Sequence, residues 1–245
     1  MPRANRYYLP GHIWHITQRC HKKEFLLKFA KDRNRLRYWI FEAKKRFDLS
    51  VLNYTITSNH IHLLILDRGT NEIPKSMQLL AGRIAQEYNH RKNRKGAFWQ
   101  DRYHATAIDT GSYLAQCIVY IDLNMVRAGV VQEPHQWQWC GYNEIQFPPE
   151  RYKIIDSNTL MKLFNVKNFN EYQILHRSWI NNKLQEINLQ REASWSSCLA
   201  IGGENYINKI NNQLNIDCRY KKIIKDNEIF KLEEQTSAYT HVFNV

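Results

Sequence analysis

Residues 49–66, LSVLNYTITSNHIHLLIL, contain two short runs rich in β-branched and apolar side chains. The first run covers residues 49–57 and the second covers residues 60–66. Between them stand Ser58 and Asn59, two residues that favour turns because their side chains hydrogen-bond the local backbone. Two strands joined by so short a connection are antiparallel neighbours. The stretch therefore predicts a β-hairpin.

The sequence on either side of this hairpin predicts two further strands and three helices. Residues 12–19 resemble a first strand, and residues 28–47 repeat apolar side chains at helical spacing. A second helix is expected to start near Pro74, a fourth strand at residues 104–108, and a third helix at residues 112–128, ended by Gly129. The order β-α-β-β-α-β predicts a ferredoxin-like α+β sandwich with an antiparallel sheet, whose helices cover one face and leave the other open to a ligand.

The remainder of the chain is expected to be helical. Pro148-Pro149 marks a domain boundary, so residues 1–147 are expected to form the main domain and residues 148–235 a helical C-terminal appendage. Helices are predicted near residues 157–164, 169–191 and 204–214. Two hypotheses stay open for this region, which either grips DNA or only packs against the first domain. Residues 236–245 are expected to form a loose tail.

The positive charge is confined to the first half of the chain. Residues 1–127 hold 22 Lys and Arg against 10 Asp and Glu, whereas residues 128–245 hold 13 of each, so the whole excess of +12 lies before residue 128. Such a distribution suits a surface that binds a polyanion such as nucleic acid. The alternative is a basic surface that only keeps the protein in solution.

Two classes of protein are disfavoured by the sequence. The five cysteines are odd in number, widely spaced and without a C-x-x-C pair, so neither a disulfide framework nor a zinc ribbon is expected. No stretch approaches the roughly 20 apolar residues that span a bilayer. We expect a cytoplasmic, nucleoid-associated protein with no membrane partner.

His60 and His62 lie two residues apart at the start of a predicted strand. Alternate residues of a strand project from the same face, so both imidazoles point one way while Ile61 points into the core. Two imidazoles on one face can bind a single metal ion. Histidines with only a surface or core role are the competing interpretation, because the H-x-H pattern is weak by itself.

The third predicted helix carries a narrow polar stripe between two apolar faces. At 100° per residue the stripe comprises Gln116, Tyr120, Asn124 and Arg127. This pattern is typical of a helix that lines an active site. The alternative is that Tyr120 simply packs with its hydroxyl in water.

Four motifs, in this order, resemble the REP-associated tyrosine transposases, a family of HUH single-tyrosine endonucleases in the IS200-like superfamily. They are HITQR at residues 15–19, NHIHLL at 59–64, FWQDRY at 98–103 and YIDLNMVRAG at 120–129. The resemblance covers roughly residues 6–142. It implies that His60 and His62 bind a divalent metal ion, that Asn124 completes the metal site and that Tyr120 is the nucleophile. Met125 stands where the family usually has proline, a difference that a helix tolerates.

The resemblance also implies a reaction and a substrate. Tyr120 would attack single-stranded DNA that carries a REP-like hairpin and form a 5′-phosphotyrosine, with Mg²⁺ or Mn²⁺ polarising the phosphate. The expected backbone contacts come from basic side chains, and the expected base stacking comes from two aromatic ones. They are Arg19, Arg91, Lys92, Arg94, Lys95, Arg102 and Arg127, with Trp99 and Tyr103. Each has a simpler alternative, namely a solvated loop for the cations and a core position for the aromatics.

Two other functions stay open from the residues. A non-catalytic module that binds single strands would use the same order of elements, and a hydrolase that activates water would use the same metal. Only the transposase hypothesis requires a covalent adduct on Tyr120. His15 is expected either to approach the DNA or to be buried, and the sequence leaves monomer and homodimer equally open.

Overall fold

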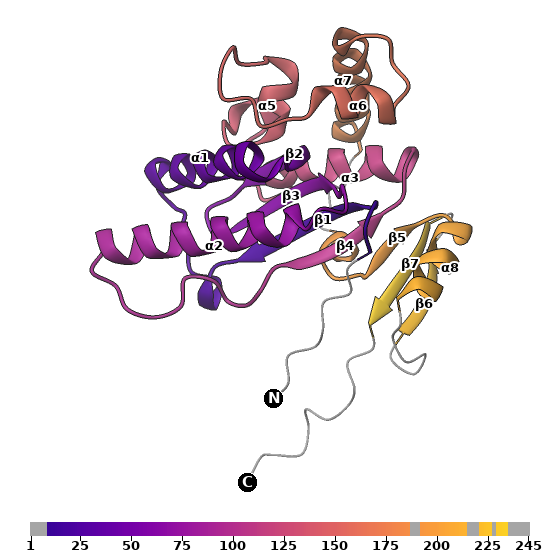
Figure 1. Cartoon of the computed structure of the whole chain (residues 1–245). Helices are drawn as coiled ribbons and strands as arrows, with labels where there is room; N and C mark the ends of the chain where they lie inside the picture. The colour runs from indigo at the N-terminus through magenta and orange to yellow at the C-terminus, as the bar shows by residue number, and fades with distance from the viewer. Residues whose placement is uncertain (1–8, 187–191, 215–220, 227–228, 235–245) are drawn as a thin grey trace.

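The computed structural model describes residues 9–186, 192–214, 221–226 and 229–234 (Figure 1). The hairpin predicted from residues 49–66 is confirmed as strands β2 (Ser50–Ile56) and β3 (His60–Leu66). The other strands of the first half are β1 (Ile13–Arg19) and β4 (His104–Ile108). Helices α1 (Ala30–Phe47) and α2 (Glu72–Arg91) lie where the apolar spacing predicts them.

The four strands form an antiparallel sheet in the order β2-β3-β1-β4. This is the order that a ferredoxin-like sandwich requires, so the expected α+β class is confirmed. Strand β3 lies between β1 and β2 in the sheet. Along the chain, α1 connects β1 to β2.

Strand register divides the sheet into an apolar and a polar face. In β1 and β3, Trp14, Ile16, Ile61, Leu63 and Ile65 share one face and are buried. The opposite face carries His15 and Thr17 of β1 beside Leu64 and His62 of β3. As expected, His60 and His62 share a face and Ile61 lies in the core.

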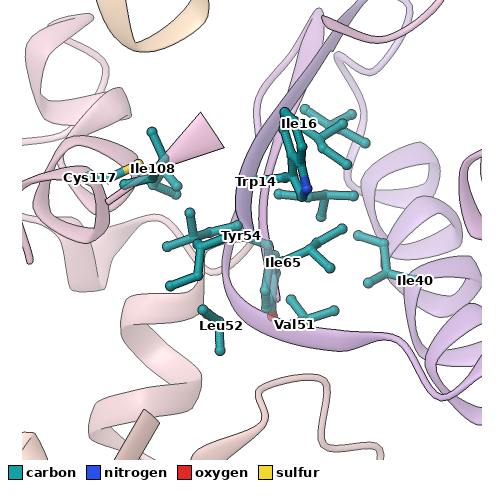
Figure 2. Packing of buried hydrophobic residues seen from close by; sticks show 14 of the residues in the cluster. Trp14, Ile16, Ile40, Val51, Leu52, Tyr54, Ile65, Ile108 and Cys117 are labelled. Carbon is teal, nitrogen blue, oxygen red and sulfur yellow. The ribbon is translucent and has the colours of Figure 1, made fainter. Parts of the chain in front are cut away.

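Helices α1 and α2 pack side by side on the apolar face (Figure 1). Ile40 of α1 points toward Val51 and Ile65 of the sheet, while Cys117 lies beside Ile108 on the other side (Figure 2). Both faces are therefore covered by packed side chains. The buried aliphatic side chains of this core are the main source of stability, because each contributes about 1.5–3 kcal/mol when it is removed from water.

The expectation of an open second face is wrong. Helix α3 (Ser112–Asp122) lies across it and is held by side chains of β2, since Thr55 Oγ1 donates to the carbonyl of Ile121 and Asn53 Nδ2 donates to that of Ile118. The short 3₁₀ helix η3 (Ala193–Ser196) packs against β1 and β4 on the same face. Any ligand must therefore bind beside these elements instead of on a bare sheet.

The third predicted helix is interrupted. Helix α3 ends at Asp122 and a single turn, α4 (Asn124–Arg127), follows. Leu123 joins them with φ −83° and ψ 7°, so its backbone leaves the helical region for one residue. Gly129 ends this segment with φ 66°, as expected.

The C-terminal region contains helices and also strands. Three of its helices were predicted, namely α6 (Ser157–Leu163), α7 (Phe169–Leu184) and α8 (Glu204–Gln213), and α5 (Gly141–Gln146) precedes them. The description of this region as only helical is wrong, because strands β5 (Ala200–Gly202), β6 (Lys221–Asp226) and β7 (Ile229–Glu234) extend the sheet to the order β2-β3-β1-β4-β5-β7-β6.

Strand β5 joins the sheet in parallel beside β4, so one sheet spans both expected regions. The predicted tail at residues 236–245 lies outside the described residues, as does the end of the helix predicted to reach residue 191. Within the described part of the chain, no helix combines the length and apolarity needed to cross a membrane.

Candidate active site

The polar face of the sheet collects four histidines under α3 and η3. His15 and His104 come from β1 and β4, and His60 and His62 come from β3. Register places His62 opposite Thr17 and His60 opposite Arg19, so these side chains stand side by side. A sheet face that carries imidazoles in place of aliphatic side chains is costly as a core unless the rings are hydrogen-bonded.

His60 is held by contacts of its Nδ1 with neighbouring side chains. Its Nδ1 lies 2.7 Å from Asn59 Oδ1 and 2.9 Å from Thr57 Oγ1. The amide oxygen of Asn59 can only accept, so Nδ1 of His60 carries the proton and donates. A neutral His60 therefore has its lone pair on Nε2, which is the atom that coordinates metals in this tautomer.

His15 connects His62 to the C-terminal region. His15 Nε2 lies 2.8 Å from His62 Nδ1, and His15 Nδ1 lies 2.6 Å from the carbonyl oxygen of Trp195 in η3. The two imidazoles are stacked, with centroids 5.0 Å apart. His15 has no exposed surface, and this burial lowers the pKa of His15 to about 4, although the Trp195 carbonyl opposes the shift. His15 is therefore neutral at pH 7.

Tyr120 lies against this histidine cluster. Its ring centroid is 5.9 Å from that of His62 and 5.9 Å from that of His15, both in edge-to-face geometry. The indole of Trp195 covers another side at 6.0 Å. The ring is 5% exposed and borders two cavities, so Tyr120 is packed and yet reaches open space.

Two residues of α4 complete the surroundings of Tyr120. Asn124 Nδ2 lies 3.1 Å from His62 Nε2. The guanidinium of Arg127 lies 4.1 Å from the centroid of the Tyr120 ring, and its Nη2 donates to the carbonyl of Tyr120 at 2.6 Å. The break at Leu123 thus turns α4 so that Asn124 faces His62 while Arg127 folds back over the phenol.

A cavity of about 640 Å³ opens onto these groups and is strongly basic. His60, His62, Tyr120 and Asn124 all line it. Four cations share the lining with one carboxylate, that of Asp101; the cations are Arg19, Lys23, Arg102 and Arg127. Such an excess of positive charge attracts a phosphate-bearing ligand, because concave low-dielectric walls focus the field.

The donor set at the cavity fits a divalent metal ion that keeps part of its water shell. No three His, Cys, Asp or Glu side chains converge on one point anywhere in the described ranges, so a site here depends on the amide of Asn124 beside the two imidazoles. Two imidazoles and one amide side chain would leave several coordination positions for water and phosphate.

Three of the seven cations predicted to contact DNA line the cavity, and four do not. Arg19, Arg102 and Arg127 line it, and Arg91 and Arg94 do not. Arg91 forms an ion pair with the buried Asp32, and Arg94 donates to the carbonyl of Ala97 at 2.9 Å. These two arginines stabilise the end of α2 and its following loop. Lys92 and Lys95 are exposed in the same loop and also lie outside the cavity lining.

The two aromatic residues expected to stack on bases are half-buried parts of the fold. Trp99 donates from Nε1 to the carbonyl of Ala81 at 3.1 Å, and its ring packs on that of Phe98. Tyr103 packs against the main core. Neither lines the cavity, so the simpler core interpretation fits both positions better.

Sequence reasoning missed Trp195, His104 and Lys23 as parts of the site. His104 Nε2 lies 3.0 Å from the carbonyl of Cys198, and burial lowers the pKa of His104 below its ordinary value. The alternation of His104 with Ala105 and Thr106 in a strand was an available signal for His104. The sequence contains no such signal for Trp195, because its contact with Tyr120 joins residues about 75 positions apart in the chain.

Comparison with known proteins identifies a related family over the first half of the chain. The model of the family "Transposase IS200 like" matches residues 9–124. A solved structure of a REP-associated tyrosine transposase bound to a REP hairpin is 20% identical, with a TM-score of 0.49, and the match covers 64% of this chain and 94% of that one.

A candidate transposase from Deinococcus radiodurans R1 is 14% identical, with a TM-score of 0.34, over 46% of this chain and 90% of that one. Among proteins with curated descriptions, none matches the chain.

Proposed function

We propose that the protein, whose residues 9–124 match the model of the IS200-like transposase family, is a strand transferase that cuts and rejoins single-stranded DNA through Tyr120. One observation carries the proposal. The ring of Tyr120 lies 5.9 Å from that of His62 at a cavity whose lining holds four cations and one carboxylate. A phenol, an imidazole pair and an amide around one basic cavity are the parts that phosphodiester cleavage needs.

The proposed reaction is a transesterification. The phenol oxygen of Tyr120 attacks the scissile phosphorus, a bond forms between them, and the bond from phosphorus to the 3′ oxygen breaks. The phenol proton passes to solvent, and the departing 3′ oxygen takes up a proton from solvent. The products are a DNA end joined to Tyr120 through its 5′ phosphate and a second end with a 3′ hydroxyl. Another 3′ hydroxyl reverses the step and joins strands without an external energy source.

The cations of the cavity supply binding and charge stabilisation. Arg127 lies over the Tyr120 ring and within the same lining, so it is placed to contact the phosphate that Tyr120 attacks. Arg19 and Arg102 are the proposed contacts to flanking phosphates. The attacked strand must be unpaired, because a buried phenol fixed on a helix cannot reach a phosphate inside a regular duplex.

Three side chains are proposed to hold Mg²⁺ or Mn²⁺, namely His60, His62 and Asn124. When bound, the metal ion would draw electron density from the phosphate and lower the cost of the extra negative charge in the transition state. The hairpin substrate is proposed from the sequence resemblance to the REP-associated tyrosine transposases.

The experiment follows a covalent adduct with end-labelled hairpin oligonucleotides and Mn²⁺. With wild-type protein, a 3′ label should appear in a retarded band on a denaturing gel, and a 5′ label should appear in a shortened free strand. Tyr120→Phe should abolish both, whereas Tyr113→Phe, a matched change in the same helix, should keep both. His60→Ala and chelation by EDTA should reduce the adduct about 100-fold or more, and His90→Ala, at an exposed position of α2, should not.

Two results would overturn the proposal in favour of the other functions. Tight binding of the oligonucleotide without any cleavage in the presence of Mn²⁺ would indicate a binding module. Cleavage that survives Tyr120→Phe and leaves no label on the protein would indicate a hydrolase that uses water.

A further inference from the structure

A line of hydrogen bonds runs from the C-terminal region through β1 to the candidate metal site. It begins at the backbone carbonyl of Trp195, passes across the ring of His15, and reaches Nδ1 of His62. Both contacts are short, at 2.6 and 2.8 Å, and both are fully buried. The ring of His62 then meets Asn124 at its opposite nitrogen, Nε2, at 3.1 Å.

The chemistry of the end groups fixes the direction of these bonds. A carbonyl oxygen only accepts, so Nδ1 of His15 must carry a proton. His15 has no contact with solvent, and an imidazolium there would lose its hydration without a counter-ion, so the ring is neutral and its Nε2 is an acceptor. The proton between the two rings therefore belongs to Nδ1 of His62. The contact with Asn124 supports the same tautomer. The amide nitrogen of Asn124 is a donor, so it requires a lone pair on Nε2 of His62.

We propose that His15 is a positioning residue that, anchored by the carbonyl of Trp195, holds His62 in the tautomer whose Nε2 lone pair faces the metal site. The inference rests on the metal site of the proposed function. A histidine ligand usually donates its second nitrogen to a carboxylate, carbonyl or water, and that partner fixes both the tautomer and the ring orientation. Here the second nitrogen of His62 donates to the buried imidazole of His15. The carbonyl of Trp195, from a distant segment, in turn fixes which nitrogen of His15 carries the proton.

The arrangement gives the C-terminal region, which lies outside the segment that matches the family model, a role in the site. Trp195 lies in η3, well after residue 124, and η3 packs on β1 and β4 around His15. Its indole also covers Tyr120, so one residue contacts the proposed nucleophile with its side chain and orients a proposed ligand with its backbone. The C-terminal region would then be part of the active site as well as a neighbour of it.

The two proposed histidine ligands would adopt the same tautomer, with the proton on Nδ1, through different partners. His60 is held in it locally, by the amide oxygen of Asn59 at 2.7 Å. His62 lies within β3 and is held in it by His15, on the neighbouring strand, at 2.8 Å. Loss of His15 should therefore affect His62 and leave His60 unchanged.

The test compares three variants of the full-length protein with wild type, without and with Mn²⁺. His15→Leu removes the acceptor, His15→Gln keeps one through its side-chain oxygen, and Trp195→Phe keeps the backbone carbonyl while changing the ring over Tyr120. The imidazole ¹⁵N shifts of His62 in the metal-free protein report its tautomer, and electron paramagnetic resonance titration gives the affinity for Mn²⁺.

We expect wild type, His15→Gln and Trp195→Phe to show His62 protonated on Nδ1. His15→Leu should show a mixture of tautomers at His62, unchanged shifts at His60, and Mn²⁺ affinity lowered by about 10- to 100-fold. Circular dichroism and thermal unfolding establish that each variant is folded.

Two results would overturn the inference. One is an unchanged His62 tautomer in a folded His15→Leu protein. The other is a tautomer with the proton on Nε2 in wild type. If wild type binds no Mn²⁺ although the tautomers behave as expected, the failure lies in the proposed metal site, and the positioning of His62 by His15 still holds.

Discussion

At the scale of single residues, the site is organised by what each nitrogen donates or accepts. The spacing of His60 and His62 was enough to predict that both rings share a face, because strand geometry alone decides it. The sequence did not decide what their second nitrogens contact. Those contacts come from Asn59, one residue away, and from His15, which only strand pairing brings within 2.8 Å.

Burial of His15 predicts a loss of stability in mild acid. Its pKa is about 4 in the fold and near 6.5 when unfolded, so between these values the unfolded chain binds more protons and stability falls as pH falls. The loss from pH 7 to pH 5 that is due to His15 should be about 2 kcal/mol. Urea unfolding at both pH values should show this dependence reduced by that amount in His15→Gln. An equal pH dependence in the two proteins would contradict the assignment.

Arg127 is expected to act through its planar shape as well as its charge. Its guanidinium lies over the Tyr120 ring and donates to the Tyr120 carbonyl, and a lysine ammonium cannot do both. Arg127→Lys should slow adduct formation about 10-fold, which corresponds to about 1.4 kcal/mol in the transition state. Arg102→Lys, an exposed change in the same cavity lining, is the control and should have a smaller effect. Equal rates for wild type and Arg127→Lys, measured in single turnover, would refute this role.

At the scale of secondary structure, most elements of the first half follow from local sequence. The two apolar runs and the turn between them specify the hairpin, and α1 and α2 follow from helical spacing. The break at Leu123 does not, because neither Gly nor Pro marks it. The polar stripe from Gln116 to Arg127, expected on one helix, is therefore divided between α3 and α4.

The contact of α5 with β2 leaves no room for a side chain at Gly141. A Cβ there would lie 2.0 Å from Asn53 Oδ1, which accepts from the backbone nitrogen of Tyr54 while its amide nitrogen reaches α3. Gly141→Ala should lower the free energy of unfolding by about 1–3 kcal/mol. Gly82→Ala, at an exposed position of α2 where a Cβ would have nothing within 4 Å, should raise it by about 0.5–1 kcal/mol. Urea denaturation measures both, and a neutral Gly141→Ala would show that β2 and α5 separate easily.

At the scale of the whole molecule, one sheet joins the two regions that the sequence separates. Helices α6, α7 and α8 were predictable from spacing. Strand β5 has only three residues, and β6 is rich in lysine, so neither has the alternating apolar pattern that marks a strand. β5 pairs with β4, which lies far from it in the sequence, and β6 pairs with β7. Local sequence did not predict these pairings, nor did it predict the contact of Trp195 with the site, which also joins distant segments.

The junction of β4 and β5 depends on Gly202. A Cβ there would lie 2.5 Å from both Asp109 Cβ and Tyr206 Cδ1. Gly202→Ala should displace β5, so the amides of Ala107 and Asp109, which donate to the carbonyls of Leu199 and Ile201, should exchange hydrogen faster. Adduct formation should fall with them, because η3 precedes β5 directly. Unchanged protection by hydrogen-exchange mass spectrometry would show that the junction tolerates the methyl group.

The carbonyl of Trp195 that anchors His15 is made late during synthesis. Translation at 5–20 residues per second separates Asn124 from Trp195 by about 4–14 seconds, and during this interval the nascent chain has both imidazoles and the phenol but lacks the group that orients one of them. A growing polypeptide would thus bind the metal ion more weakly than the finished protein. The full orientation of His62 would arrive only with the last third of the protein.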